Sequence, residues 1–194
     1  YVVQWVLQHG APDDRAAVVA KTKTRLLRLA RHKFASNVVE QVIEVASPAD
    51  RRALLDELLA PLDPAESNAG PTLLTGPEPT CAAMVMMQDQ YANYVLQRFL
   101  QVVQGEDRER LVTKIRPVLA ALRQIAHPAP GASGSFYGGG IRLPGGGHIG
   151  SKPLLAIERL VEQPPERAGA GAGPGGSSAF RTGRSGSRSA AAHA

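Results

Sequence analysis

The chain has 194 residues, a formal net charge of +5 and a sequence pI of about 9.7. The length fits one domain with tails, and the basic balance is compatible with a nucleic-acid partner. A single cysteine excludes an internal disulfide, the five histidines lack metal-ligand spacing, and no apolar stretch is long enough to span a bilayer. We therefore expect no metal, no cofactor and no membrane partner.

The first 60 residues predict helices. Apolar residues recur at helical spacing in two stretches, 38–43 and 54–59. Ser47-Pro48-Ala49-Asp50 is typical of a helix start, because serine caps a helix, proline suits its first position and an acid complements the helix dipole. Pro12, which two aspartates follow, predicts another start.

Two inserts interrupt the helical pattern. The first, 61–80, contains five prolines, and the second, 127–151, contains glycine runs without the strand-then-helix context of a phosphate loop. Between the inserts, helices are predicted from Cys81 to about Ala126, and a further helix is predicted at 152–162. The last segment, 163–194, is rich in Gly, Ala, Ser and Arg, so we predict a disordered basic tail and disorder in both inserts.

A short pattern recurs along the chain. Ser36-Asn37-Val38-Val39-Glu40 and Asn93-Tyr94-Val95-Leu96-Gln97 lie 57 residues apart, and Tyr1-Val2-Val3-Gln4 lies 36 residues before its match at Asn37. The insert at 61–80 accounts for the longer of the two spacings. Each copy has the form polar, flat or amide, apolar, apolar, Gln or Glu. Three copies at consistent spacing predict an α-helical repeat protein.

The pattern places hydrogen-bonding and planar groups on one face of a helix. Residues i and i+4 lie one turn apart on that face, so the first and fifth residues of a copy project together, while the apolar pair points inward. Such a face matches the edge and the π-face of an unpaired base. Glutamate only accepts, which suits guanine, and glutamine suits the mixed edge of uracil. The predicted RNA-binding residues are Tyr1, Gln4, Ser36, Asn37, Glu40, Asn93, Tyr94 and Gln97.

These segments resemble the Pumilio-type RNA-binding repeats of the PUF family. The similarity is most specific in 32–40 and 89–97, and it covers roughly 1–126 and 152–161. It implies an all-α fold, a right-handed α-solenoid of three-helix repeats. A partial repeat and two further repeats would fill 1–126, and 152–162 would be a C-terminal capping helix. The resemblance also implies that the chain is a fragment of a longer array.

The resemblance further implies a role in post-transcriptional regulation. PUF proteins of this kind bind UGU elements in mRNA 3′ untranslated regions, with the protein antiparallel to the RNA. We therefore expect a cytoplasmic monomer that binds single-stranded RNA and recruits repressor or deadenylase proteins. Carried over residue by residue, the first uracil is read by Asn93, Tyr94 and Gln97, the guanine by Ser36, Asn37 and Glu40, and the second uracil by Tyr1 and Gln4.

Three other classes of function predict different properties. A protein-binding helical solenoid would grip a peptide on the same face and show no preference for UGU. A nucleolar Pumilio-like ribosome-assembly factor would bind structured RNA, although base-reading positions tend to be degenerate in such proteins. An enzyme would need an acid and a base, or a nucleotide loop, at credible spacing, and the sequence offers neither. We therefore predict no catalytic residues.

Overall fold

The computed structural model describes residues 1–63, 80–126, 140–142 and 148–163. Two short strands, β1 (Gly140–Arg142) and β2 (His148–Gly150), pair antiparallel. The predicted disorder of both inserts and of the tail falls largely on residues outside the described ones. The helices are α1 (Val2–His9), α2 (Pro12–Lys23), α3 (Leu26–Ala30), α4 (Ala35–Val45), α5 (Pro48–Leu59), α7 (Ala82–Met87), α8 (Ala92–Val102), α9 (Gly105–Ala126) and α10 (Ser151–Glu162).

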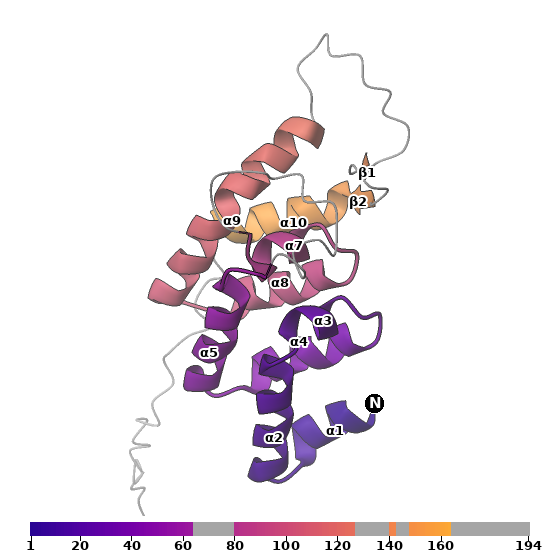
Figure 1. Cartoon of the computed structure of the whole chain (residues 1–194), viewed down its shortest axis with the longest axis vertical. Helices are drawn as coiled ribbons and strands as arrows, with labels where there is room; N and C mark the ends of the chain where they lie inside the picture. The colour runs from indigo at the N-terminus through magenta and orange to yellow at the C-terminus, as the bar shows by residue number, and fades with distance from the viewer. Residues whose placement is uncertain (64–79, 127–139, 143–147, 164–194) are drawn as a thin grey trace, which may run out of the picture.

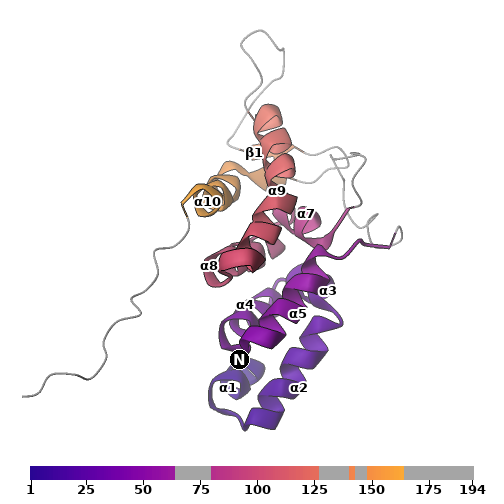
Figure 2. The ribbon, with the colours of Figure 1, turned by 90° about the vertical axis from the view of Figure 1, so that its left-hand side faces the viewer.

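The helices stack in two layers. A first layer contains α1, α4 and α8, and a second layer contains α2, α5 and α9, with the short α3 and α7 beside them (Figures 1 and 2). The units α3–α4–α5 and α7–α8–α9 are therefore two three-helix repeats, and α1–α2 occupy the places of the last two helices of a preceding unit. The all-α solenoid predicted from the sequence is confirmed.

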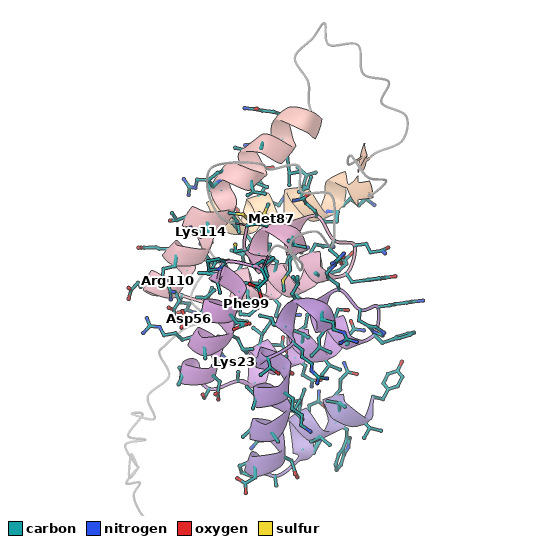
Figure 3. The ribbon with its side chains drawn as sticks, viewed as in Figure 1. Lys23, Asp56, Met87, Phe99, Arg110 and Lys114 are labelled. Atoms are coloured by element: carbon teal, nitrogen blue, oxygen red, sulfur yellow. The ribbon has the colours of Figure 1, made fainter. Side chains whose placement is uncertain are left out.

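An apolar core runs between the layers. Residues 57 positions apart in α4 and α8 occupy equivalent places, so that Val42 corresponds to Phe99 and Ile43 to Leu100, all fully buried. Figure 3 shows Phe99 and Met87 in the interior of the second repeat. The methionines of α7 are buried, as core-filling residues should be. Leu54, Leu55 and Leu58 of α5 close the core from the second layer.

Side-chain contacts set the ends of the helices in the first repeat. The Asp50 N–H donates to the Ser47 hydroxyl oxygen at 3.1 Å, and Pro48 is the first residue of α5, which confirms the predicted start. Arg51 donates from Nε to the main-chain oxygen of Ile43 at 3.1 Å and from its NH2 group to that of Ala46 at 3.0 Å. These bonds satisfy carbonyl groups that the end of α4 leaves unpaired, and they fix the turn from the first layer to the second.

The first insert leaves the solenoid and returns to it at one point. Pro61 and Cys81 form an antiparallel bridge, and the Leu62 N–H donates to the main-chain oxygen of Thr80 at 2.9 Å. On either side of the insert, α5 and α7 pack together. The two repeats therefore pack directly against each other despite the insert, which explains why the sequence pattern resumes after it.

The helix α10, which contains the segment predicted as a capping helix, packs against α8 and α9. Its apolar stripe of Leu154, Ile157 and Val161 is buried against α8 and α9. Arg108 of α9 donates to the main-chain oxygen of Leu160, and Arg123 lies 2.6 Å from Glu158. Pro153 is the third residue of the helix, where the missing N–H removes no intrahelical bond.

The strands β1 and β2 correct the sequence analysis, which predicted no secondary structure within the insert at 127–151. They pair Gly140 with Gly150, Ile141 with Ile149 and Arg142 with His148. Each strand has three residues of which one is apolar, so there is no alternation for a sequence pattern to register. Because β2 ends at the residue before α10, the pair lies at the entry to the capping helix.

Candidate nucleic-acid interface

The N-terminal ends of α4 and α8 are built in the same way. His32 Nδ1 accepts hydrogen bonds from the N–H groups of Phe34 and Ala35 at 3.2 and 3.3 Å. Asp89, 57 residues later, accepts from the N–H groups two and three residues further on, both at 2.9 Å. Each of these side chains lies two residues before the N-cap residue and caps the helix start from there, by pairing main-chain N–H groups. They fix where each helix begins, and so which side chains of the repeated pattern share a face.

On α8, two of the predicted residues bind each other. Gln97 Nε2 donates to Asn93 Oδ1 at 3.0 Å, and Asn93 Nδ2 donates to the main-chain oxygen of Asp89 at 2.9 Å. Asn93 is 2% exposed, whereas Tyr94 is 52% exposed. Asn93 therefore orients the amide of Gln97, which keeps its carbonyl oxygen and one N–H for a ligand. Tyr94 offers an open ring to a stacking partner.

On α4, the corresponding residues do not bind each other. The Ser36 hydroxyl is buried and donates to the main-chain oxygen of Lys33 at 3.4 Å, a weak bond. Asn37 is exposed, in the place that Tyr94 has on α8. The Glu40 side chain, 22% exposed, lies in an ion pair with Arg98 of α8 at 3.7 Å. The hydroxyl, the amide and the carboxylate thus follow one another along α4 as the sequence predicts, and the carboxylate faces the neighbouring repeat.

The copy on α1 differs from the prediction. Tyr1 is fully exposed and Gln4 is half-buried, but the apolar residues between them, Val2 and Val3, are exposed rather than turned inward. Within the described residues, only α2 and α4 make substantial contact with α1, which leaves this side of the helix uncovered. The helix ends at Gly10, where a Cβ would lie 2.5 Å from the Val6 main-chain oxygen, so the position requires glycine.

The carboxyl of Glu40 has an electrostatic environment that sequence reasoning missed. Burial raises its pKa above the ordinary value, Arg98 opposes that rise and Glu44 adds to it. Arg98 also lies 3.0 Å from a carboxylate oxygen of Glu44. The sequence places Arg98 directly after the pattern, but only the packing of α8 on α4 shows which acids it meets. Asp89 was also missed, although its spacing ahead of α8 is a recognisable cap signal.

The described residues contain neither a metal-binding cluster nor a membrane-spanning helix. Among them, no group of three or more His, Cys, Asp or Glu side chains lies close enough together to hold a metal ion. Nor does that part of the chain contain a helix with the length and apolar character needed to cross a membrane. The predicted RNA-binding residues lie at or beside α1, α4 and α8, the three adjacent helices of the first layer.

Known proteins share these repeats. The family model described as Pumilio-family RNA binding repeat matches residues 1–21, 25–59 and 84–116, which hold the three copies of the pattern. The mRNA-binding protein PUF3 of Saccharomyces cerevisiae is 30% identical over 112 residues, 58% of this chain and 12% of that protein. The maternal protein pumilio of Drosophila melanogaster is 50% identical over 46 residues, 24% of this chain and 3% of that protein. The chain thus spans a small part of the length of these relatives.

Solved structures share the fold. The crystal structure of PUF-8 in complex with PBE-RNA matches with a TM-score of 0.52 and 31% identity, over 66% of this chain and 33% of that chain. The Puf3 RNA binding domain bound to the Cox17 RNA 3′ UTR recognition sequence, site B, matches with a TM-score of 0.55 and 25% identity, over 84% and 39%. Together with the stacked three-helix units and the repeated pattern, these matches show that the chain belongs to the Pumilio family of repeat proteins.

Proposed function

We propose that this chain binds single-stranded RNA by sequence and reads a UGU element. One observation carries the proposal: adjacent helices of one layer present a set of polar or planar groups from the same three positions. On α8 the set is a buried amide, an exposed ring and a second amide, and on α4 it is a hydroxyl, an exposed amide and a carboxylate. In a solenoid, successive repeats face successive positions of an extended ligand, so these sets would face successive bases.

The chemistry of the sets assigns the bases. The Glu40 carboxylate accepts hydrogen bonds and donates none, which suits the adjacent N–H donors on the edge of guanine. Gln97 has a carbonyl oxygen and an N–H for the mixed edge of uracil, and Gln4 has the same pair on α1. The full assignment is Asn93, Tyr94 and Gln97 to the first uracil, Ser36, Asn37 and Glu40 to the guanine, and Tyr1 and Gln4 to the second uracil.

The relatives support RNA as the ligand. One of them is an mRNA-binding protein by name, and two solved neighbours hold RNA, one of these a 3′ UTR recognition sequence. We extend this to the present chain as a proposal. It would act as a monomer on the 3′ untranslated regions of messengers in the cytoplasm, and it would repress or destabilise them by recruiting repressor or deadenylase proteins.

Binding to short RNAs that differ at one base tests the proposal. Fluorescence anisotropy with labelled octamers containing UGU, UAU or UUU should show the tightest binding to UGU. Glu40→Gln should weaken binding to UGU by about tenfold to hundredfold, because an amide N–H would meet a guanine N–H, and should weaken UAU and UUU less. Glu57→Gln makes the same chemical change on an exposed residue of the second layer, and it should leave all three affinities unchanged.

Two outcomes would contradict the proposal. Equal weakening of all three RNAs by Glu40→Gln would remove the guanine assignment. Equal affinity of the unaltered chain for all three RNAs would remove sequence-specific reading as a whole. Binding of a peptide to the first layer without any RNA preference would favour a protein-binding solenoid in its place.

A further inference from the structure

Arg98 links the reading groups of adjacent repeats. It follows Gln97 on α8, and its guanidinium lies between α8 and α4. One terminal nitrogen, NH1, lies 3.0 Å from a carboxylate oxygen of Glu44 and donates to Oε1 of Gln101 at 3.0 Å. The other, NH2, lies 3.7 Å from Oε2 of Glu40. One residue of the second repeat therefore contacts the carboxylate that the proposed function assigns to guanine in the first.

The two contacts of Arg98 differ in a way that matters for a ligand. The 3.0 Å ion pair with Glu44 and the hydrogen bond to Gln101 hold the guanidinium in place. The contact to Glu40 is longer, at 3.7 Å, so the effect of Arg98 on this carboxylate is mainly that of its charge. We infer that Arg98 is a positioning residue for guanine specificity, because its guanidinium holds the Glu40 carboxylate against the adjacent repeat. This inference rests on the proposed function.

The charges around Glu40 define what the removal of Arg98 would do. Of the helices packed against α4, α8 contributes Arg98 as the cation that acts on this carboxyl, and α4 itself contributes Glu44 as the acid that acts on it. Burial and Glu44 both raise the pKa of Glu40, and Arg98 is the group that lowers it. Without Arg98, the carboxyl would take up a proton at higher pH. A protonated carboxyl has a donor where guanine also has donors, so the preference for guanine would fall.

The equivalent position of the first repeat shows that the cation is specific to this site. The residue 57 positions before Arg98 is Gln41, which carries no charge. It follows Glu40 just as Arg98 follows Gln97, and it belongs to the helix that packs against α1, where the pattern ends in Gln4. Glutamine has no ionisable group, so recognition of a base by Gln4 would need no neighbouring cation. The cation therefore occurs beside the copy of the pattern that ends in an acid.

The test compares Arg98→Met with Arg98→Lys in the full chain, across pH 5 to 8. The ratio of affinities for UGU and UAU octamers should be about tenfold to hundredfold in the unaltered chain. It should fall severalfold in Arg98→Met and decline at a higher pH than in the unaltered chain, whereas Arg98→Lys should restore most of the ratio. Glu44→Gln should shift the decline to lower pH, because it removes the acid that opposes ionisation of Glu40. An effect on folding alone would weaken UGU and UAU together.

Arg110→Met is the matched control. Arg110 also joins two repeats through an acid, Asp56 of α5 at 2.7 Å, but on the second layer (Figure 3). Its replacement should leave both the ratio and its pH dependence unchanged. A change equal to that of Arg98→Met would show a general effect of inter-repeat ion pairs and overturn the inference.

A measurement without RNA separates this inference from the proposed function. Titration of the Glu40 side-chain carboxyl carbon by NMR should give a higher midpoint in Arg98→Met than in the unaltered chain. An identical midpoint would overturn the inference even if UGU is preferred. Equal affinity of the unaltered chain for UGU and UAU would instead overturn the proposed function, and the specificity role of Arg98 with it.

Discussion

The helices α4 and α8 are two copies of one element, and the difference between them lies in what their polar residues contact. Both begin behind a side-chain cap, and both bury an apolar stripe in the same register. On α8 the first and fifth residues of the pattern bind each other, as Gln97 donates to Asn93. On α4 the fifth residue, Glu40, faces Arg98 of the next repeat. The same helix geometry therefore supports a polar pair within one helix in the second repeat. In the first repeat, the corresponding side chain pairs with a residue of the adjacent repeat.

The largest expected difference in stability is between substitutions in the buried apolar stripes of α8 and α4. Phe99→Ala should lower the free energy of unfolding by about 3–5 kcal/mol, because it removes a fully buried ring and leaves a cavity. Val42→Ala, at the equivalent place on α4, removes less volume and should cost about 2 kcal/mol. Urea unfolding of the two variants measures both values. Equal losses would show that the two repeats do not pack in the same register.

The second largest difference is expected between the capping side chains, Asp89 before α8 and His32 before α4. Asp89→Ala removes two hydrogen bonds to main-chain N–H groups and the 3.1 Å ion pair with Arg31, so it should cost about 2 kcal/mol. His32→Ala removes two longer hydrogen bonds, which a ring nitrogen accepts, and should cost about 0.5–1 kcal/mol. Thermal unfolding followed by circular dichroism compares the two. A larger loss for His32→Ala would mean that charge on the cap does not set its strength.

The hydrogen-bonded pair on α8 should affect binding rather than stability. Asn93→Ala frees the amide of Gln97 to rotate, so affinity for RNA with uracil at the first position should fall by about fivefold to tenfold. The preference between UGU and UAU should stay, because Glu40 is untouched. Anisotropy with UGU, CGU and UAU octamers measures both effects. Unchanged affinity for UGU would show that Asn93 does not position Gln97.

The sequence predicted much of this frame. The spacing of 57 residues identified equivalent residues on α4 and α8, because each side chain repeats in one register, and Ser47-Pro48 marked the start of α5. Local signals of this kind depend on neighbours in the chain. The strand pair at 140–142 and 148–150 escaped prediction because it is too short to show alternation.

The contacts of the candidate site were less predictable than its members. The three residues of the patterns on α4 and α8 could be named from spacing, but the partner of Glu40 lies 58 residues away in the sequence, on another helix. Its identity depends on how α8 packs against α4, and no local pattern encodes that. The exposure of Val2 and Val3 was missed for the same reason, since burial depends on which helices cover α1.

The smallest expected effect separates the binding role of Glu40 from its effect on the fold. Its pKa is raised in the folded chain, so the folded state holds the proton more tightly than the unfolded state. Below the unfolded pKa the carboxyl is protonated in both states and there is no cost, but stability falls as the pH rises through the folded pKa. Glu40→Gln should therefore raise the free energy of unfolding at pH 7 by a few tenths of a kcal/mol, roughly.

Thermal unfolding at several pH values checks this prediction. The gain from Glu40→Gln should shrink toward zero as the pH falls below about 4. Glu57→Gln, on an exposed residue of α5, serves as the control and should change nothing at either pH. A loss of stability at pH 7 would mean that the ion pair with Arg98 outweighs burial. A gain, combined with weaker binding to UGU, would mean that the fold bears a small cost to keep a carboxylate at the guanine position.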